Sequence, residues 1–317
     1  MRVVVALGGN AVLTRGEAPD ADIQEHHVRA AVQALLPLAR AHQLVLTHGN
    51  GPQVGALALE SAKDPALTRP YPLDVLSAQT QGMIGYWLLQ ALDEGSPGTA
   101  VAALITRTIV SLSDPAFVDP QKFVGPVYEE DEARRIASQS GWIVKVDGPY
   151  WRRVVASPSP LGIVEIPLIR TLVDAGVMVV CAGGGGIPVS RDPSGRLTGV
   201  EAVVDKDATA ALLAEQLGAD ALLMLTDVAA VFRDYGTDRE RPIHLTEPTF
   251  LRSLQFPTGS MGPKVDAACR FVERTGGIAG IGALAEAEAI LKGRAGTLVM
   301  PRGSKPVGLV PPERRSD

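Results

Sequence analysis

The chain has 317 residues, of which 46% are apolar and 21% charged, an ordinary globular composition that excludes bulk disorder. This length suits one large or two medium domains. The net charge of −5 disfavours nucleic acid as the main partner, because neutralising phosphates requires a basic surface. No apolar run reaches about 18 residues, so we expect no helix that crosses a membrane.

The two cysteines, Cys181 and Cys269, lie in apolar surroundings. One disulfide between them is possible, but such surroundings are typical of buried thiols, which persist in reducing compartments. No signal peptide precedes the first expected strand, which begins near residue 2. We therefore expect a cytoplasmic protein with two free thiols.

Strand and helix patterns alternate along the chain. Apolar runs rich in β-branched residues predict buried strands at residues 3–7, 44–47, 101–105, 177–181, 221–225 and 277–281. Apolar residues at helical spacing predict helices at residues 23–41, 77–92, 207–217 and 263–275. This alternation predicts an α/β fold with a mainly parallel sheet that helices cover on both faces. The polar residues 311–317 are expected to be a frayed tail.

The alternation pauses between residues 113 and 160, a stretch rich in proline, charged residues and aromatics. We interpret this stretch as an inserted subdomain or lid, and we expect its aromatic side chains to form a small core of their own. The remainder, up to about residue 310, would be one α/β domain.

Four glycine-rich turns follow predicted strands or open a predicted helix. They are Gly8-Gly9-Asn10-Ala11, His48-Gly49-Asn50-Gly51-Pro52, residues 183–186 and Gly259-Ser260-Met261-Gly262-Pro263-Lys264. Glycine allows close approach of a ligand to the backbone, and a turn between a strand and a helix aims its amides at an anion. Each turn alone could be an ordinary tight connection, but several on one sheet edge predict a phosphate site.

Two common phosphate motifs are absent from the sequence. No G-x-x-x-x-G-K-[ST] run occurs, which excludes a P-loop protein. The third glycine of the segment that begins at Gly49 comes one residue late for the dinucleotide fingerprint, and no acidic residue follows about 20 positions later. NAD is therefore disfavoured as a ligand.

Lysine is scarce, with 7 residues against 23 arginines, so each lysine is informative. Lys206 lies between Asp205 and Asp207, at the expected start of a helix, and Lys264 ends the fourth glycine turn. One alternative is that Lys206 is a surface lysine between two aspartates that cap the helix. We interpret Lys206 and Lys264 as groups that neutralise a transferring phosphoryl group, with Asp207 holding both ammonium groups in position. Lys122 lies in the lid.

Other catalytic arrangements are not supported by the sequence. No nucleophile and histidine pair stands out, and no metal-ligand spacing such as H-E-x-x-H or paired C-x-x-C occurs. Among the five histidines only His48 lies in a glycine turn, where orienting the turn by a hydrogen bond is the expected role.

The motifs together resemble the amino-acid kinase superfamily and, within it, the carbamate kinase family. The resemblance runs from about residue 2 to 300. It is carried by residues 7–11, 47–55, 70–76, 81–86, 183–189, 199–207 and 259–264, several long motifs in the right order. It implies a three-layer αβα sandwich with a protruding lid, a homodimer, and Mg²⁺-dependent reversible phosphoryl transfer between ATP and carbamate, giving ADP and carbamoyl phosphate. Such enzymes usually form ATP in arginine or related nitrogen catabolism.

The resemblance also implies roles for particular residues. Phosphate and carbamate would be cradled by Gly8, Gly9, Asn10, Gly49, Asn50, Gly51, Gly184 and Gly185. Lys206, Lys264, Asp207 and the lid residue Lys122 would form the catalytic set. The nucleotide would be bordered by Thr226, Asp227 and Met261, and Mg²⁺ would bind nucleotide oxygens and water rather than protein side chains.

The lid departs from the family pattern at Phe123, Pro149 and Ala156. We expect these changes to affect lid closure and substrate affinity rather than the reaction. Two alternatives remain: a sister kinase acting on acetylglutamate, a phosphonate or a nucleotide, and a nucleotide-binding sensor that has lost catalysis. The presence of Lys122, Lys206 and Lys264 argues against the sensor.

Overall fold

The structure is a computed structural model that describes residues 1–14, 16–256 and 261–304. Its centre is an eight-stranded sheet in which the pairing of β16 with β17 is antiparallel and the other pairings are parallel. In spatial order the strands are β15 (Leu245–Thr246), β17 (Thr297–Val299), β16 (Ile278–Ala283), β12 (Ala221–Thr226), β1 (Arg2–Leu7), β2 (Gln43–His48), β9 (Met178–Val180) and β3 (Val101–Ala103). All six strands expected from the sequence lie in this sheet, with ends that differ by one or two residues.

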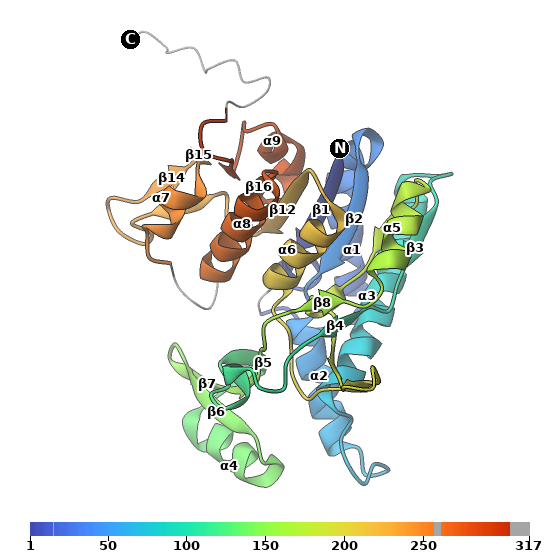
Figure 1. Cartoon of the computed structure of the whole chain (residues 1–317). Helices are drawn as coiled ribbons and strands as arrows, with labels where there is room; N and C mark the ends of the chain where they lie inside the picture. Colours follow the sequence, from blue (N-terminus) through green and yellow to red (C-terminus); the bar gives the residue numbers. More distant parts are fainter. Residues whose placement is uncertain (15, 257–260, 305–317) are drawn as a thin grey trace.

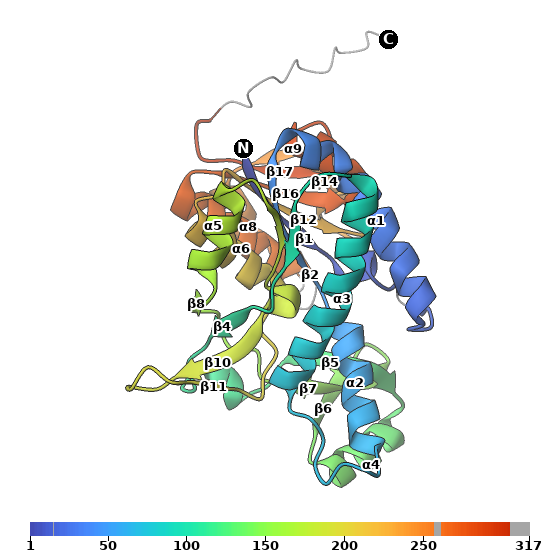
Figure 2. The same ribbon diagram turned by 90° about the vertical axis from the view of Figure 1, so that its right-hand side faces the viewer.

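Alternate side chains of the central strands point into two separate hydrophobic cores. Val3, Val5 and Leu7 of β1 pack on one face with α1 (Ala21–Ala41), α3 (Leu73–Gly95) and α9 (Ala287–Leu291). Val4 and Ala6 pack on the other face with α5 (Ile166–Asp174), α6 (Lys206–Leu217) and α8 (Met261–Thr275). Figures 1 and 2 show the sheet between these helix layers. The expected α/β fold with three layers is confirmed.

Two smaller sheets accompany the central sheet. One has the order β11 (Leu197–Gly199), β10 (Ile187–Arg191), β4 (Arg107–Ile109) and β8 (Gly162–Ile163), and another pairs β13 (Val231–Arg233) with β14 (Arg241–Ile243). A short helix, α7 (Pro248–Arg252), packs beside α8. Among the described residues, no helix is both long and apolar enough to cross a membrane.

Residues 113–160 contain a three-stranded antiparallel sheet and a helix that lie apart from the sandwich in Figure 1. The strands are β5 (Lys122–Tyr128), β7 (Tyr150–Val155) and β6 (Ile143–Asp147), and the helix is α4 (Glu130–Ser140). This segment, called the lid below, contacts α2 (Gly51–Lys63). The contact is closest at Gly55, where an added Cβ would lie 2.1 Å from the Cα of Gly125.

The expectation that the lid's aromatic residues form their own core is wrong. Trp142 stacks on the guanidinium of Arg153 at 4.2 Å, and Trp151 stacks on Arg134 at 4.8 Å. Two buried apolar residues of the lid, Val124 and Val155, instead join a cluster with α2 and α3; its other members are Val54, Ala58, Leu73, Leu76 and Val203. A sheet of three strands with one helix has too little interior to enclose indole rings, so it uses the neighbouring helices as its core.

Candidate active site

Three turns meet at the carboxyl ends of the adjacent strands β12, β1 and β2. The first turn, Gly8 to Ala11, follows β1, and the second connects β2 to α2 through Gly49 and Asn50. Thr226 and Asp227 end β12 beside them. Because parallel strands end at the same edge of a sheet, residues more than 200 positions apart come together here.

Glycine is favoured at two points of this junction, because any side chain there would be tightly packed. A Cβ at Gly49 would lie 3.0 Å from the amide nitrogen of Gly9, and a Cβ at Gly8 would lie 3.0 Å from the carbonyl oxygen of Leu225. At Gly9 and Gly51, in contrast, a Cβ would meet no described atom within 4 Å. The first pair of glycines lets the turns approach each other, and the second pair faces open space that a ligand can use.

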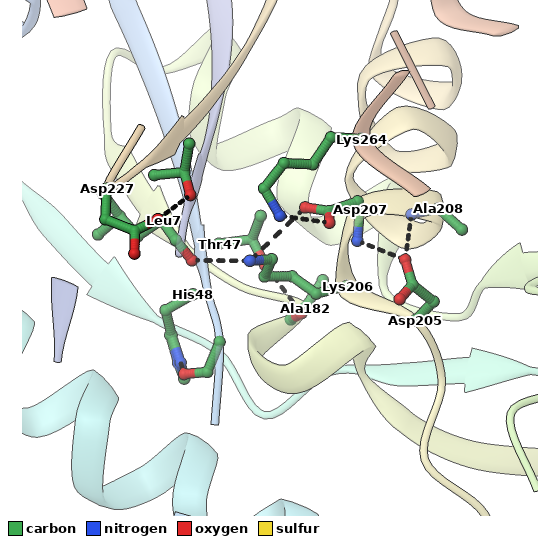
Figure 3. Close-up of polar contacts among 12 residues, drawn as sticks. Leu7, Thr47, His48, Ala182, Asp205, Lys206, Asp207, Ala208, Asp227 and Lys264 are labelled. Carbon is green, nitrogen blue, oxygen red and sulfur yellow. Dashed lines mark hydrogen bonds and ion pairs between the residues drawn. The ribbon is translucent and has the colours of Figure 1, made fainter. Parts of the chain in front are cut away.

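The start of α6 brings two lysines onto one carboxylate (Figure 3). Lys264, from α8, places its Nζ 3.0 Å from Oδ2 of Asp207. Lys206 places its Nζ 3.5 Å from Oδ1 of Asp207 and donates a hydrogen bond of 3.2 Å to the carbonyl oxygen of Leu7. Asp205 caps the helix, since its Oδ1 accepts 3.0 Å hydrogen bonds from the amides of Asp207 and Ala208. Asp205, Lys206, Asp207 and Lys264 are called the lysine–aspartate cluster below.

Burial makes this cluster receptive to an anion. It lowers the pKa of the Lys206 ammonium, an effect that Asp207 opposes and the second ammonium, Lys264, reinforces. The Asp207 side chain is only 7% exposed, so the ion pairs are poorly screened by water. A phosphate group placed beside the two ammonium groups would offset both their desolvation and their mutual repulsion.

The lid contributes a third lysine. Lys122 is the first residue of β5, and its Nζ lies 2.5 Å from Oδ2 of Asp205. Three ammonium groups, those of Lys122, Lys206 and Lys264, therefore accompany two carboxylates. The contact between Lys122 and Asp205 joins residues 83 positions apart, and nothing in the sequence pattern pairs them.

An open pocket with an empty volume of about 600 Å³ adjoins the cluster. Its lining is mostly apolar and consists of Thr226, Asp227, Val228, Ala230, Phe232, Tyr235, Phe256, Met261 and Lys264. Three residues expected to border a nucleotide, Thr226, Asp227 and Met261, are therefore brought together. Sequence reasoning missed Phe232 and Tyr235, although aromatic residues a few positions after Asp227 were a usable signal. Asn10 connects this pocket to the first turn by donating a 2.7 Å hydrogen bond to Asp227.

Other expected site residues are buried behind the turns. Asn50 donates a 2.9 Å hydrogen bond to Thr80, and a Cβ at Gly184 would lie 2.1 Å from the Asn50 amide nitrogen. Gly185 packs equally closely on Val204, where a Cβ would lie 2.5 Å from the carbonyl oxygen. These glycines support Asn50 and the start of α6 from below, and their contact with phosphate stays a prediction.

His48 is fully buried beneath the second turn. Desolvation lowers its pKa to about 4, and nearby Lys206 also disfavours its charged form. The neutral ring donates from Nδ1 to the carbonyl oxygen of Gly49, at 3.0 Å. His48 thus orients the turn, as expected. Cys181 and Cys269 are likewise buried free thiols, and burial raises the pKa of both.

The fourth glycine turn is only partly described. Its first residues, Gly259 and Ser260, lie outside the described residues, as do residues 311–317, which were expected to form a frayed tail. Met261 to Lys264 form the first turn of α8, and this helix places Lys264 at the cluster.

Comparison with known proteins identifies the family. The model of the amino acid kinase family matches residues 1–281. The carbamate kinase of Rhizobium meliloti is 50% identical over 303 residues, covering 94% of this chain and 93% of that protein. The carbamate kinase of Escherichia coli K12 is 48% identical over 297 residues, covering 94% and 98%.

A solved structure gives the same result. Carbamate kinase from Giardia lamblia bound to AMP-PNP superposes with a TM-score of 0.87 at 38% identity, covering 95% of this chain and 98% of that chain. At this identity and coverage the similarity extends beyond the fold to the family. This chain therefore belongs to the amino acid kinase family and, within it, to the carbamate kinases.

Proposed function

We propose that this carbamate kinase transfers a phosphoryl group between ATP and carbamate at the lysine–aspartate cluster. The observation that carries the proposal is the convergence of Lys206 and Lys264 on Asp207, between the open glycine turns and the apolar pocket. Phosphoryl transfer needs positioning and charge neutralisation more than covalent help from the protein. The convergent ammonium groups meet that need.

The nucleotide would occupy the pocket lined by Phe232 and Tyr235. Lys264 both lines this pocket and contacts Asp207, so a base held there directs its phosphates toward the cluster. The binding of AMP-PNP by the Giardia lamblia relative supports a nucleotide pocket in this fold. Thr226, Asp227 and Met261 would border the nucleotide.

Carbamate would bind on the opposite side of the cluster, at the open faces of Gly9 and Gly51. The surrounding donors would be backbone amides, Asn10, and Lys122 from the lid, while the buried Asn50 supports this side from behind by its hydrogen bond to Thr80. No arginine lies in these turns to grip a larger carboxylate substrate in a bidentate manner. A small anion is therefore the better fit.

In this arrangement a carbamate oxygen attacks the γ-phosphorus of ATP, and the bond to the β,γ-bridging oxygen breaks to release ADP. The nucleophile is already an anion, so no side chain has to remove a proton. Lys206 and Lys264 would stabilise the charge that spreads over the transferring group and the leaving oxygen. Asp207 holds both ammonium groups, while Lys122 would contact carbamate or carbamoyl phosphate.

Magnesium would enter with the nucleotide. In residues 1–14, 16–256 and 261–304, no three His, Cys, Asp or Glu side chains come close enough to hold a metal ion. Both oxygens of Asp207 face lysines. The ion fits best on nucleotide oxygens and water, as Mg²⁺ often binds, and it would neutralise phosphate charge there.

Two further parts of the proposal rest on the family resemblance. One is the physiological direction, ATP formation from carbamoyl phosphate in arginine or related nitrogen catabolism. The other is a homodimer, for which the edge strand β3 and the exposed side chains of Tyr86, Ile105 and Leu168 offer apolar surface.

The test compares ADP release from ATP with four acceptors at matched concentration: bicarbonate plus ammonia as the source of carbamate, N-acetylglutamate, aspartate and UMP. Turnover is expected with carbamate only, because a site built for a small polar ligand rejects poor fits strongly. ATP formation from ADP and carbamoyl phosphate checks the reverse direction. Comparable rates with N-acetylglutamate or UMP would overturn the substrate assignment.

A further inference from the structure

We propose that Asp205 is a positioning residue that holds the lid lysine, Lys122, at the active site. The inference rests on the proposed function, in which Lys122 contacts carbamate or carbamoyl phosphate. It assigns to Asp205 a second task beside the capping of α6.

The two oxygens of the Asp205 carboxylate serve different elements. Oδ1 accepts hydrogen bonds of 3.0 Å from the amides of Asp207 and Ala208, which fixes the carboxylate to the start of α6 (Figure 3). Oδ2 lies 2.5 Å from Nζ of Lys122. Because the first oxygen is anchored to a rigid helix, the second presents a fixed point of negative charge to the lid.

The environment keeps this contact strong. The side chains of Lys122 and Asp205 are 34% and 24% exposed, so water screens the pair only in part. Burial would raise the pKa of Asp205, but the charge of Lys122 and the helix amides outweigh it and lower the pKa to about 2. The carboxylate is thus ionised at any physiological pH.

A lysine side chain is flexible, so Lys122 needs a partner that holds its ammonium group in one position. Its four-carbon stem has several rotatable bonds, and an unpaired Lys122 would lose this freedom on meeting substrate. The ammonium group of Lys122 has three donor hydrogens, and it donates one of them to Asp205. The remaining donors are available to an anion, so the ordering cost is met before substrate arrives.

The middle of β5 is also fixed, which makes the placement of Lys122 specific. Gly125, three residues after Lys122, packs against Gly55 of α2. Backbone packing therefore places the strand, and Asp205 places the tip of the lysine side chain.

The experiment uses Asp205→Asn in the full chain. Asparagine keeps the capping oxygen, but its amide group cannot accept from Lys122 and presents donor hydrogens to it. We expect the KM for carbamoyl phosphate to rise about fivefold to tenfold, in the range of one partly buried ion pair, and the KM for ADP to stay within about twofold. Thermal stability should change little.

Asp119→Asn is the matched control. It removes the lid ion pair between Asp119 and Lys145, whose atoms lie 2.6 Å apart, by the same chemical change away from the cluster. Neither KM should change. Asp205→Ser, which also caps helices, provides a second route if Asp205→Asn does not fold.

A double-variant cycle separates this inference from the proposed function. In a Lys122→Met background, Asp205→Asn should change the KM for carbamoyl phosphate by less than about twofold, because the pair is already broken. If Lys122→Met raises this KM but Asp205→Asn does not, or if the two effects multiply, Asp205 has no positioning role. If Lys122→Met itself leaves this KM unchanged, the assignment of Lys122 in the proposed function is wrong.

Discussion

At this site, burial and neighbouring charges together determine the charge state and the role of each side chain. Lys206 carries a buried charge that desolvation disfavours, and Asp207 keeps that charge in place. His48, in contrast, has no carboxylate beside it among the residues that the structure describes, so burial leaves it neutral and suited to orienting a turn. The same desolvation therefore makes one residue a strong electrostatic contact and the other a structural support.

The first prediction concerns Lys206→Met, which keeps the length of the side chain and removes its charge. We expect kcat to fall by about 10² to 10³, the usual loss when one preorganised charge contact to a transition state is removed. Folding should persist, because Lys264 remains paired with Asp207 at 3.0 Å. Steady-state kinetics together with thermal unfolding would measure both effects.

Lys292→Met is the matched control for this prediction. Lys292 follows α9 directly and forms an ion pair with Glu288 of that helix. Half of its side chain is exposed. Its loss should leave kcat unchanged. Near-normal turnover in a folded Lys206→Met protein would remove Lys206 from the catalytic set.

At the scale of elements, the sequence predicted the strands and the turns that follow them, because local patterns determine both. Apolar β-branched runs predicted the strands of the central sheet, because buried parallel strands need apolar side chains on both faces. Glycine turns after those runs then predicted a shared ligand edge. The contact of Lys122 with Asp205 could not be predicted, because it depends on how the lid docks. The lid's own packing was misjudged for the same reason: its core includes residues of α2 and α3.

Lid docking can be tested at its closest contact with Gly55→Ala. The added Cβ would lie 2.1 Å from the Cα of Gly125, so α2 and β5 must move apart. Overpacking of this kind typically costs about 1–3 kcal/mol. We expect a lower melting temperature and a higher KM for carbamoyl phosphate, with the KM for ADP little changed, because the nucleotide pocket does not include the lid.

Gly82→Ala provides the comparison for Gly55→Ala. Gly82 lies exposed in α3, and a Cβ there would meet no described atom within 4 Å. Alanine should be neutral or slightly stabilising in this helix. Equal kinetics for the two variants would mean that the contact between Gly55 and Gly125 does not set the position of the lid.

Across the whole molecule, the two substrates would meet from different parts of the chain. The proposed nucleotide pocket is lined by residues from Thr226, at the end of β12, to Lys264. The proposed carbamate side would be formed by the turns after β1 and β2 and by Lys122 of the lid. The lysine–aspartate cluster lies between them and contacts both, through Lys264 on one side and Asp205 on the other. Each ligand alone should therefore stabilise a different part of the molecule.

Amide hydrogen exchange would show which segments each ligand stabilises. A ligand at about 100 times its dissociation constant adds about 2.7 kcal/mol to the free energy of any opening that releases it. ADP alone should slow amide exchange in β13 and at the end of β12, where Phe232 and Thr226 line the pocket. Carbamoyl phosphate alone should slow exchange in β5 and β7 of the lid, because an anion bound by the already positioned Lys122 adds a contact that holds these strands in place. With the Asp205→Asn variant the protection by carbamoyl phosphate should weaken, while that by ADP stays the same. If carbamoyl phosphate leaves the lid amides unchanged, or if both ligands protect the same segments, the small substrate does not bind against the lid and Lys122 is not part of its site.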